Sequence, residues 1–371
     1  MHQLNLSKTF KFVLCGTFAF AAAATSGCAS KTLEAPENAK EVLAQKEYED
    51  VMKVQEISPS GEYVRLPGPE PKTPAAVPVT AAEKAAAKKV KADAAKAANE
   101  AKLKAKATPI ATPPIPGKKE PDFEDASGFI GRRPIKDPFR VGEKVTLEAS
   151  YFGVAAGDIT LGVEPSVQVN GRKSYHFKGK AESTSVFAMF YAVEDWFETF
   201  VDFETLLPFN YRLSVKESKQ LRETRSYFDW DKLKGFYWDK RITKEKGVEE
   251  QKIEWNILNW SQNLFSAAFY LRTFQLEPGK KLQFRVGHEG KNILVTGTVL
   301  RREVLDTRLG KFKTVVMSPR IEIDGVFRPM GDINFWLTDD DRKFIIRIES
   351  KIKIGKIIAE LKKLDKGREL P

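Results

Sequence analysis

Strict alternation of apolar and polar residues is the feature that most limits the fold of this chain. In residues 209–216 apolar side chains (Phe209, Tyr211, Leu213, Val215) alternate with polar ones (Asn210, Arg212, Ser214, Lys216). The same period of two runs through residues 344–354. Successive side chains of a β-strand point to opposite faces of its sheet, so the pattern predicts strands with one buried and one solvated face.

Further segments are predicted as strands on the same grounds: residues 143–154, 157–169, 172–184, 191–203, 221–230, 233–242, 281–289, 292–304, 311–323 and 332–338. Turn signals separate most of them, at Val169-Asn170-Gly171, Glu289-Gly290-Lys291, Leu309-Gly310 and Asp324-Gly325. Many strands joined by short turns predict a mainly β domain, an antiparallel meander curled into a barrel or half-barrel.

One segment has a helical pattern instead. In residues 260–273 (WSQNLFSAAFYLRT) the apolar residues fall on one helix face, and Ser261 or Asn263 supplies a cap. We expect this short helix to pack on the concave face of the sheet.

The aromatic residues around this helix are abundant for a simple core. A half-barrel with a displaceable helix would offer an apolar pocket for an acyl chain or a lipidated partner. The candidate ligand-binding residues are Trp260, Phe265, Phe269 and Arg272. Two alternatives stay open. In the first, the aromatic side chains simply fill the core and no ligand enters. In the second, Arg272 is one partner of a structural salt bridge rather than a cation at the pocket rim.

Candidate chemistry is sparse, and we predict no catalytic residue, no metal site and no cofactor. His176 and His288 lie in predicted strands without a second His or Cys at ligand spacing, and a zinc site needs three or four such donors. The triplet Asp339-Asp340-Asp341 lacks the spacing of a calcium loop and is interpreted as a solvated turn. Glu194 and Asp195 are neighbours on a strand and point to opposite faces, so they cannot flank one glycosidic bond.

The N-terminal sequence is predicted to be an export signal. Lys8 and Lys11 precede an apolar run of 13 residues at 12–24, too short to span a bilayer as a helix. The sequence Thr25-Ser26-Gly27-Cys28 then resembles the lipobox of bacterial lipoproteins. This resemblance implies that residues 1–27 are a signal peptide and that Cys28 is acylated after cleavage. The alternative is an ordinary signal, cleaved after Ala22-Ala23-Ala24.

The lipobox resemblance also implies a location. Residue 29 is Ala, not Asp, which implies sorting to the outer membrane, with the domain lipid-anchored there and facing the periplasm. Cys15 lies in the segment that would be removed, so the mature chain keeps Cys28 as its single cysteine. No disulfide is then available, and the domain must rest on its core.

Residues 28–138 are predicted to be a tether rather than a packed domain. Two Pro-rich stretches flank residues 81–107, which consist almost wholly of Ala, Lys and acidic residues and have almost nothing to bury. A helical spacer with polyproline flanks would hold the domain, residues 139–371, roughly 100 Å from its lipid. The alternative is a disordered spacer that merely clears the membrane surface.

The excess positive charge lies in the predicted domain, which holds 40 basic and 33 acidic residues. In a cell envelope such a surface fits anionic lipid headgroups, lipopolysaccharide or cell-wall polymers such as peptidoglycan. The alternative is a soluble basic face without a partner. Nucleic acid is not expected as a partner of an exported protein, and the sequence identifies no protein partner.

Several motifs of the predicted domain follow the pattern of one exported bacterial family: NLFSAAFYLRTFQLEPGKKLQFRV at 263–286, Leu309-Gly310-Lys311-Phe312, Phe335-Trp336-Leu337-Thr338 and the ending at 348–361. Val141-Gly142-Glu143 opens the first strand in the same way. The chain is similar to domain-of-unknown-function family 3108 over about residues 139–364. The resemblance implies an exported β domain and leaves the activity open.

These features together predict a non-catalytic lipoprotein of the cell envelope. Its β domain is expected to bind a hydrophobic or anionic component (lipid, lipopolysaccharide or lipoprotein) or to scaffold envelope proteins. The alternative is a hydrolase or transferase that acts on cell-wall or lipid substrates. The sequence contains no recognisable pairing of nucleophile and base, which favours the first.

Overall fold

The computed structural model describes Leu33, Leu43 and residues 51–57, 137–323, 326–328, 333–352 and 354–368. The predicted signal peptide, Cys28 and most of the predicted tether lie outside these residues. No helix in the described part of the chain is both long enough and apolar enough to cross a membrane.

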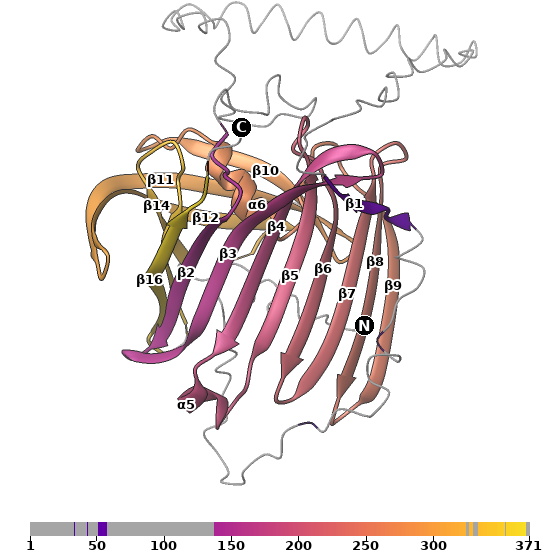
Figure 1. Ribbon diagram of the computed structural model, residues 1–371, viewed down its shortest axis with the longest axis horizontal. Coiled ribbons are helices and arrows are strands. Elements are labelled where there is room, and N and C mark those ends of the chain that lie inside the picture. The colour runs from indigo at the N-terminus through magenta and orange to yellow at the C-terminus, as the bar shows by residue number, and fades with distance from the viewer. Residues whose placement is uncertain are drawn as a thin grey trace, which may run out of the picture. The chain divides into compact units, whose positions relative to one another are not determined.

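The predicted mainly β fold is confirmed, because the described residues form one antiparallel sheet of 16 strands (Figure 1). Fourteen of them follow the order β10-β11-β12-β14-β15-β16-β2-β3-β4-β5-β6-β7-β8-β9, while β1 pairs with β3 and β13 with β12. The strands are β1 (Val54–Glu56), β2 (Glu143–Tyr151), β3 (Val154–Val169), β4 (Arg172–Ser183), β5 (Glu194–Asp202), β6 (Pro208–Glu217), β7 (Gln220–Asp229), β8 (Lys234–Thr243), β9 (Gly247–Asn256), β10 (Lys281–His288), β11 (Lys291–Thr307), β12 (Gly310–Ile323), β13 (Val326–Arg328), β14 (Ile333–Thr338), β15 (Ile345–Lys351) and β16 (Lys356–Lys366).

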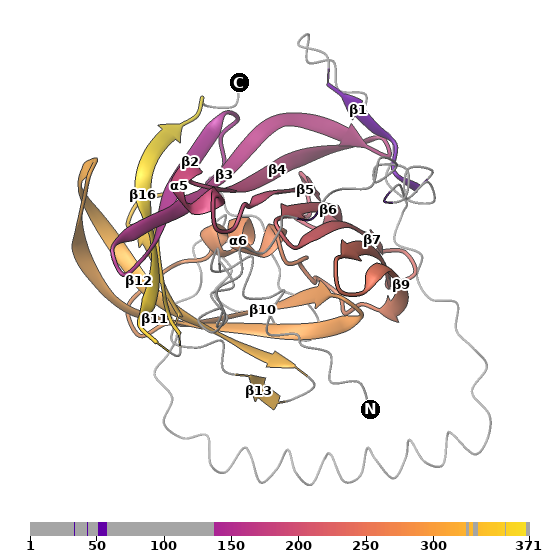
Figure 2. The ribbon, with the colours of Figure 1, turned by 90° about the horizontal axis from the view of Figure 1, so that it is seen from below.

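The sheet curls but its ladder does not close. The first long strand, β2, pairs with the last, β16, and the two ends of the order are β9 and β10, which are consecutive in sequence. The connection between them holds α6 (Ser266–Tyr270) and the 3₁₀ turn η1 (Leu271–Thr273). Figure 2 shows α6 enclosed by the curled sheet, as expected for a helix on the concave face.

The helix is shorter than predicted. It begins at Ser266 rather than at residue 260, and Trp260 lies before it with a φ of 66°, which no helical residue adopts. The pattern of apolar residues over 260–264 therefore reflects burial in an irregular segment. Five elements were not predicted: the strands β1, β9, β13 and β16, and the four-residue helix α5 (Ser185–Ala188).

Two-residue turns set the register of several hairpins. Asn170-Gly171 joins β3 to β4 and Glu289-Gly290 joins β10 to β11, with both residues of each turn at positive φ. Such turns match the right-handed twist of the strands they connect. These predicted turns are confirmed, while Asp324-Gly325 lies outside the described residues.

The main core lies between the concave face of the sheet and α6. Phe269 of α6 stacks on Phe177 of β4 with ring centroids 4.0 Å apart, and Phe139 packs edge-on against Phe177 at 4.9 Å. Leu147 and Phe274 are completely buried in the same cluster. Burial of this apolar surface is the main term that stabilises a cysteine-free domain.

Part of the predicted tether packs on the opposite face of the sheet. Val201 belongs to the main core, so its neighbour Phe200 points outward, and Phe200 packs with Val167, Val169 and the buried Met52. The adjoining β1 pairs with β3, Val54 opposite Val169. The described residues 51–57 thus belong to the β domain rather than to a free spacer.

Candidate functional site

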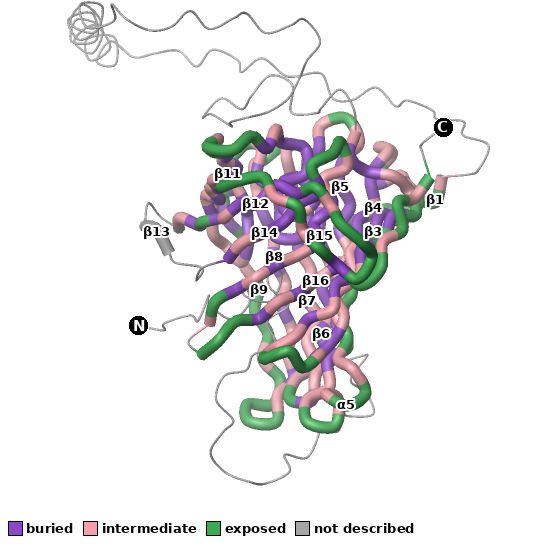
Figure 3. Tube along the Cα trace, turned by 90° about the vertical axis from the view of Figure 1, so that its left-hand side faces the viewer, coloured by how far each residue is buried: buried purple, intermediate pink, exposed green. Residues whose placement is uncertain are grey.

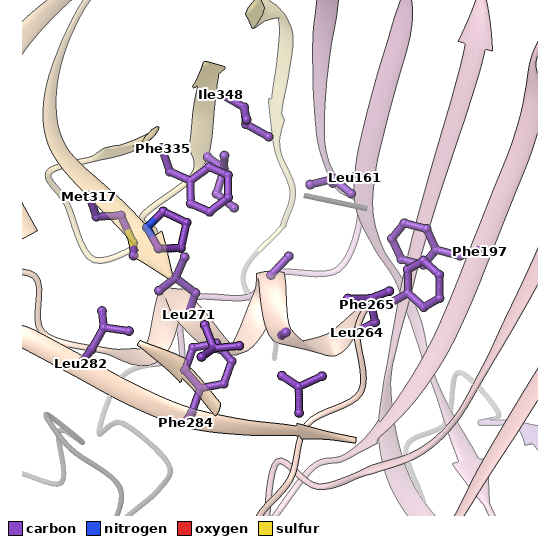
Figure 4. Close-up of a pocket in the computed structure, with 16 residues that line it drawn as sticks. Leu161, Phe197, Leu264, Phe265, Leu271, Leu282, Phe284, Met317, Phe335 and Ile348 are labelled. Atoms are coloured by element: carbon purple, nitrogen blue, oxygen red, sulfur yellow. The ribbon is translucent and has the colours of Figure 1, made fainter. Parts of the chain in front are cut away.

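An apolar cavity of about 50 Å³ lies between the α6 segment and the sheet (Figure 4). It is lined by 16 residues, all of them apolar, from β3, β5, the 264–271 segment and the β10–β15 half of the sheet. Most of them are buried, while Leu161, Phe197 and Ala268 are half-buried. The most exposed part of the lining therefore lies where β3 and β5 meet the α6 segment.

Phe197 and Phe265 form one wall of this cavity. Their rings stack with centroids 4.2 Å apart. The ring of Phe197 lies directly over Gly179 of β4, where an added Cβ would be only 2.1 Å from it. Glycine at 179 thus gives Phe197 the space to lie flat against the sheet and to stack on α6.

The sequence-predicted aromatic residues separate in the structure. Phe265 lines the cavity. Phe269 points the other way, into the core around Phe177, and touches only a smaller void of about 10 Å³. Trp260 is half-buried in the turn before the helix and does not line the cavity.

Asn263 fixes the start of the helical segment. Its Oδ1 accepts hydrogen bonds from the amides of Phe265 (2.9 Å) and Ser266 (2.8 Å), which is the capping role predicted for it. Its Nδ2 donates to Thr199 Oγ1 (2.8 Å) and to the carbonyl of Asn210 (2.9 Å). One buried amide therefore joins the helix to β5 and β6.

Arg272 fixes the other end through a buried ion pair; it does not line the apolar cavity and borders only the smaller void. Its Nη1 donates to Glu143 Oε1 at 2.6 Å, and its other nitrogens donate to the carbonyls of Pro138 (2.8 Å) and Arg342 (2.9 Å). The guanidinium of Arg342 pairs with the second oxygen of Glu143. Only 4% of Arg272 is exposed, so its charge is neutralised inside the protein.

A second buried polar cluster was not predicted from the sequence. Arg222 of β7 donates to Asp239 Oδ1 (2.6 Å), to Tyr237 OH (2.8 Å) and to Glu289 Oε1 (3.1 Å). Tyr237 OH also donates to Glu289, at 3.0 Å. The tip of the β10–β11 hairpin is thereby held against β7 and β8.

His288 completes this cluster. It is 4% exposed, and its Nδ1 lies 3.2 Å from Tyr211 OH, while its Nε2 lies 3.6 Å from Glu289 Oε1. Burial lowers the pKa of His288, so the ring is neutral at pH 7. The sequence did hold one signal: Glu289 opens a two-residue turn at a φ of 47°, where Asn, Asp or Gly is usual.

A carboxylate with unusual protonation lies at one end of β5. Burial, followed by the neighbouring Glu217 carboxylate, raises the pKa of Asp195 to about 8. Asp195 Oδ1 accepts a hydrogen bond from the amide of Lys216 at 2.9 Å. Among the described residues no group of three or more His, Cys, Asp or Glu side chains is arranged to hold a metal ion.

Comparisons with known proteins add a family but no activity. The sequence matches none of the curated proteins with which it was compared. A β-barrel-like protein of the DUF1849 family from Brucella abortus aligns with a TM-score of 0.39 and 12% identity, over 61% of this chain and 98% of that one. An exported protein with a YmcC-like fold from Bacteroides fragilis aligns with a TM-score of 0.28 and 9% identity, over 62% and 98%.

The family model is the informative match. Residues 144–362, more than half of the chain and nearly all of the described sheet, match the family described as protein of unknown function (DUF3108). The match covers the α6 segment, the cluster around Arg222 and Glu289, and all the strands except β1 and the outer ends of β2 and β16. The chain therefore belongs to the DUF3108 family.

Proposed function

We propose that this chain is a non-catalytic lipoprotein of the cell envelope whose β domain binds the end of an acyl chain in the cavity beside α6. The observation that carries the proposal is the wholly apolar lining of that cavity, three of whose side chains are only half-buried. An apolar cavity stays dry and gains free energy when an apolar group of fitting size enters it.

The size of the cavity limits what it holds. Its volume of about 50 Å³ is roughly a third of that of an engineered apolar cavity that binds benzene. The resident space therefore fits the terminal carbons of an acyl chain rather than a whole chain. Deeper entry requires the stacked rings of Phe197 and Phe265 to separate, while Asn263 and Arg272 keep the ends of the helical segment in place.

The anchoring part of the proposal rests on Cys28 and its lipobox-like surroundings. Acylation of Cys28 would attach the chain to the outer membrane, with the β domain in the periplasm. Mass spectrometry of the N-terminal peptide from the native envelope tests this part by itself. A diacylated or triacylated Cys28 supports it, and an unmodified chain that begins after Ala24 contradicts it.

Ligand binding is tested with cis-parinaric acid, a naturally fluorescent fatty acid, added to the mature chain in detergent-free buffer. We expect saturable binding that Ala268→Leu weakens by at least about tenfold, a loss of about 1.4 kcal/mol. Leucine at 268 adds carbon atoms to a half-buried residue of the lining and occupies the space that the ligand needs. Phe265→Ala is expected to enlarge the cavity and to keep or improve binding.

The matched control is Val304→Leu, which adds one carbon atom to a side chain that is exposed on β11, outside the cavity lining. It is expected to bind like the parent chain. Absence of saturable binding, or equal binding by the Ala268→Leu and parent chains, contradicts the proposed site. Turnover of a peptidoglycan fragment or a phospholipid by the purified chain would support the enzymatic alternative instead.

A further inference from the structure

One end of the sheet presents a row of exposed apolar side chains. They belong to the β2–β3 turn, to α5 and its following loop, and to the β15–β16 turn: Phe152, Val154, Val186, Met189, Phe190 and Ile354. Phe152 is 70% exposed and Phe190 is 77% exposed. Single exposed apolar residues are ordinary, whereas several on adjoining loops indicate an interaction surface.

Hydrogen bonds join these loops into one continuous surface, which we call the apolar rim. The hydroxyl of Tyr151 donates to the carbonyl of Ile354 at 2.9 Å, which holds the β15–β16 turn beside the β2–β3 turn. The amide of Thr184 donates to the carbonyl of Ala156 at 2.9 Å, which holds α5 beside the start of β3. Figure 1 shows α5 and the β2–β3 turn at the same end of the sheet, and Figure 3 shows exposed loops around α5.

The geometry of α5 indicates that this exposure is built into the fold. The helix has four residues and none of them is buried. Thr184 starts it by accepting a hydrogen bond from the amide of Phe187 at 3.2 Å. The helix thus contributes little to the core of the domain, yet its residue Val186 and the following Met189 and Phe190 are exposed and apolar.

The N-terminal segment reaches the same end of the sheet. The amide of Leu33 donates to the carbonyl of Ser218, in the β6–β7 turn, at 2.8 Å. Ser218 in turn exchanges hydrogen bonds with Ala192, in the loop that follows α5: its Oγ accepts from the Ala192 amide at 2.8 Å, and its own amide donates to the Ala192 carbonyl at 3.0 Å. Leu33 therefore lies beside the apolar rim.

Leu33 follows Cys28 by five positions in the sequence. Five residues span at most about 18 Å when fully extended. An acyl group on Cys28 would hold this end of the sheet within that distance of the membrane surface. Residues 58–136 follow β1 and precede β2 in the sequence, so the stretch of chain from Cys28 to Leu33 does not include them.

We propose that the apolar rim is a membrane-contacting surface that lies against the phospholipid leaflet in which the Cys28 acyl chains are embedded. The proposal rests on the proposed acylation for its orientation, and it deepens that function by assigning a second point of contact. Phe152, Met189 and Phe190 enter the boundary between headgroups and acyl chains, where exposed apolar side chains leave water. The Pro-rich and Ala/Lys-rich stretch is then a long insertion in a membrane-proximal domain, and it does not set the height of the domain above the lipid.

The test uses the mature chain from residue 28 with Cys28→Ser, so that no acyl chain contributes. Binding to vesicles of phosphatidylethanolamine with a minor share of phosphatidylglycerol is measured by sedimentation. We expect binding that persists at high salt, because insertion of apolar side chains is not screened. Phe152→Asp combined with Phe190→Asp is expected to lower the partition coefficient of the chain onto the vesicles by at least about tenfold.

The matched control is Val304→Asp combined with Leu309→Asp, which makes the same change of charge at exposed apolar residues of β11 and of the turn after it. It is expected to bind like the parent. Equal binding by the rim variant, or no binding by the parent, overturns the proposal. Far-ultraviolet circular dichroism confirms that each variant keeps its strands.

A second readout places individual residues in the bilayer. The mature chain with Cys28→Ser contains no cysteine, so a cysteine introduced by Met189→Cys can be labelled specifically with one environment-sensitive NBD fluorophore. Vesicles are expected to shift its emission to shorter wavelength and doxyl-labelled lipids to quench it, while a probe at Leu309→Cys stays in water. An unquenched probe at 189, or concentration-dependent dimerisation that buries it without lipid, overturns the proposal. Neither result depends on fatty-acid binding or on acylation, so failure here is distinct from failure of the proposed function.

Discussion

Arg272 and Glu143 are 129 positions apart in the sequence and form a buried ion pair with a distance of 2.6 Å between Nη1 and Oε1. The pair connects the turn after α6 to the first residue of β2. Phe139 and Phe344 lie against the faces of the guanidinium, 5.2 and 5.1 Å from its carbon. The only helical segment inside the curled sheet, within the described residues, is thus tied to the strand at which the family match begins.

Replacement of Arg272 by Met should destabilise the domain strongly. Glu143 would lose one of its two cations while remaining 2% exposed, and removal of one partner of a buried pair typically costs about 3–5 kcal/mol. Urea unfolding measures the change. Arg308→Ala is the control, because it breaks an exposed pair with Glu148 that is worth at most about 1 kcal/mol. Equal small losses in both variants would contradict a structural role for Arg272.

Gly179→Ala should force Phe197 out of its stack on Phe265. A Cβ at 179 would be 2.1 Å from the Phe197 ring, and overpacking of this kind costs about 1–3 kcal/mol. Gly287→Ala is the control, because its Cβ would have no neighbour nearer than 3.4 Å. The free energy of unfolding of both variants is the measurement, and a neutral Gly179→Ala would show that the ring has room to move.

Asp195 should lower the stability of the domain as the pH rises from about 4 to about 8. The unfolded chain releases this proton near its usual pKa of about 3.9, whereas the folded chain keeps it up to a pKa of about 8. The folded state therefore binds more protons within this window, and a rise in pH favours the unfolded state. Asp195→Asn keeps an oxygen for the Lys216 amide and cannot ionise.

Melting temperatures measured from pH 4 to pH 9 test this. At pH 9 the Asp195→Asn chain should melt at least about 3 °C higher than the parent, and the difference should shrink toward pH 4. Asp231→Asn, in an exposed turn, controls for the removal of one carboxylate. Parallel pH profiles for the parent and Asp195→Asn would show that Asp195 titrates normally in the folded state.

Met52→Asp should detach the N-terminal segment from the sheet. Met52 is 8% exposed and packs against Val167 and Val169, next to the strand pairing of β1 with β3. Hydrogen exchange at the amides of residues 168 and 170 should become faster, because Asn170 donates to the carbonyl of Lys53 and alternate amides of β3 face β1, while exchange in β6 is unchanged. Val51→Asp changes the exposed neighbour and serves as the control. Unchanged exchange in Met52→Asp would mean that β1 does not protect this end of β3.

Local patterns predicted most of the sheet because alternation reports directly on a surface with one buried face. β9 was not predicted, because its only large apolar side chains are those of Val248, Ile253 and Trp255 and most of the strand is exposed. β16 was not predicted, because the alternation over residues 344–354 continues past the end of β15 and gives no sign of the turn that leads into β16. The helix was predicted at the correct position but too long. Its length was overestimated because burial in an irregular segment produces the same apolar positions as a helix face.

In the candidate site too, some residues could be predicted from local sequence and others could not. Phe265 and the position of the helix follow from local sequence, and both contribute to the cavity. The partners of Arg272 and the cluster around Glu289 depend on which strands meet, and no local pattern specifies that Arg222, Tyr237 and Glu289 converge. Residues that act through long-range pairing become visible only once the order of the strands is known.

The open ladder between β9 and β10 has a mechanical consequence. This seam is bridged by side chains, with Asn292 donating to the carbonyl of Asn256 at 2.9 Å and Glu289 held by Arg222 and Tyr237. Separation of the two edges would break these contacts while every rung of the β-ladder elsewhere stays intact. The domain is thus a curled sheet with one unpaired seam, where side-chain contacts take the place of a β-ladder between β9 and β10.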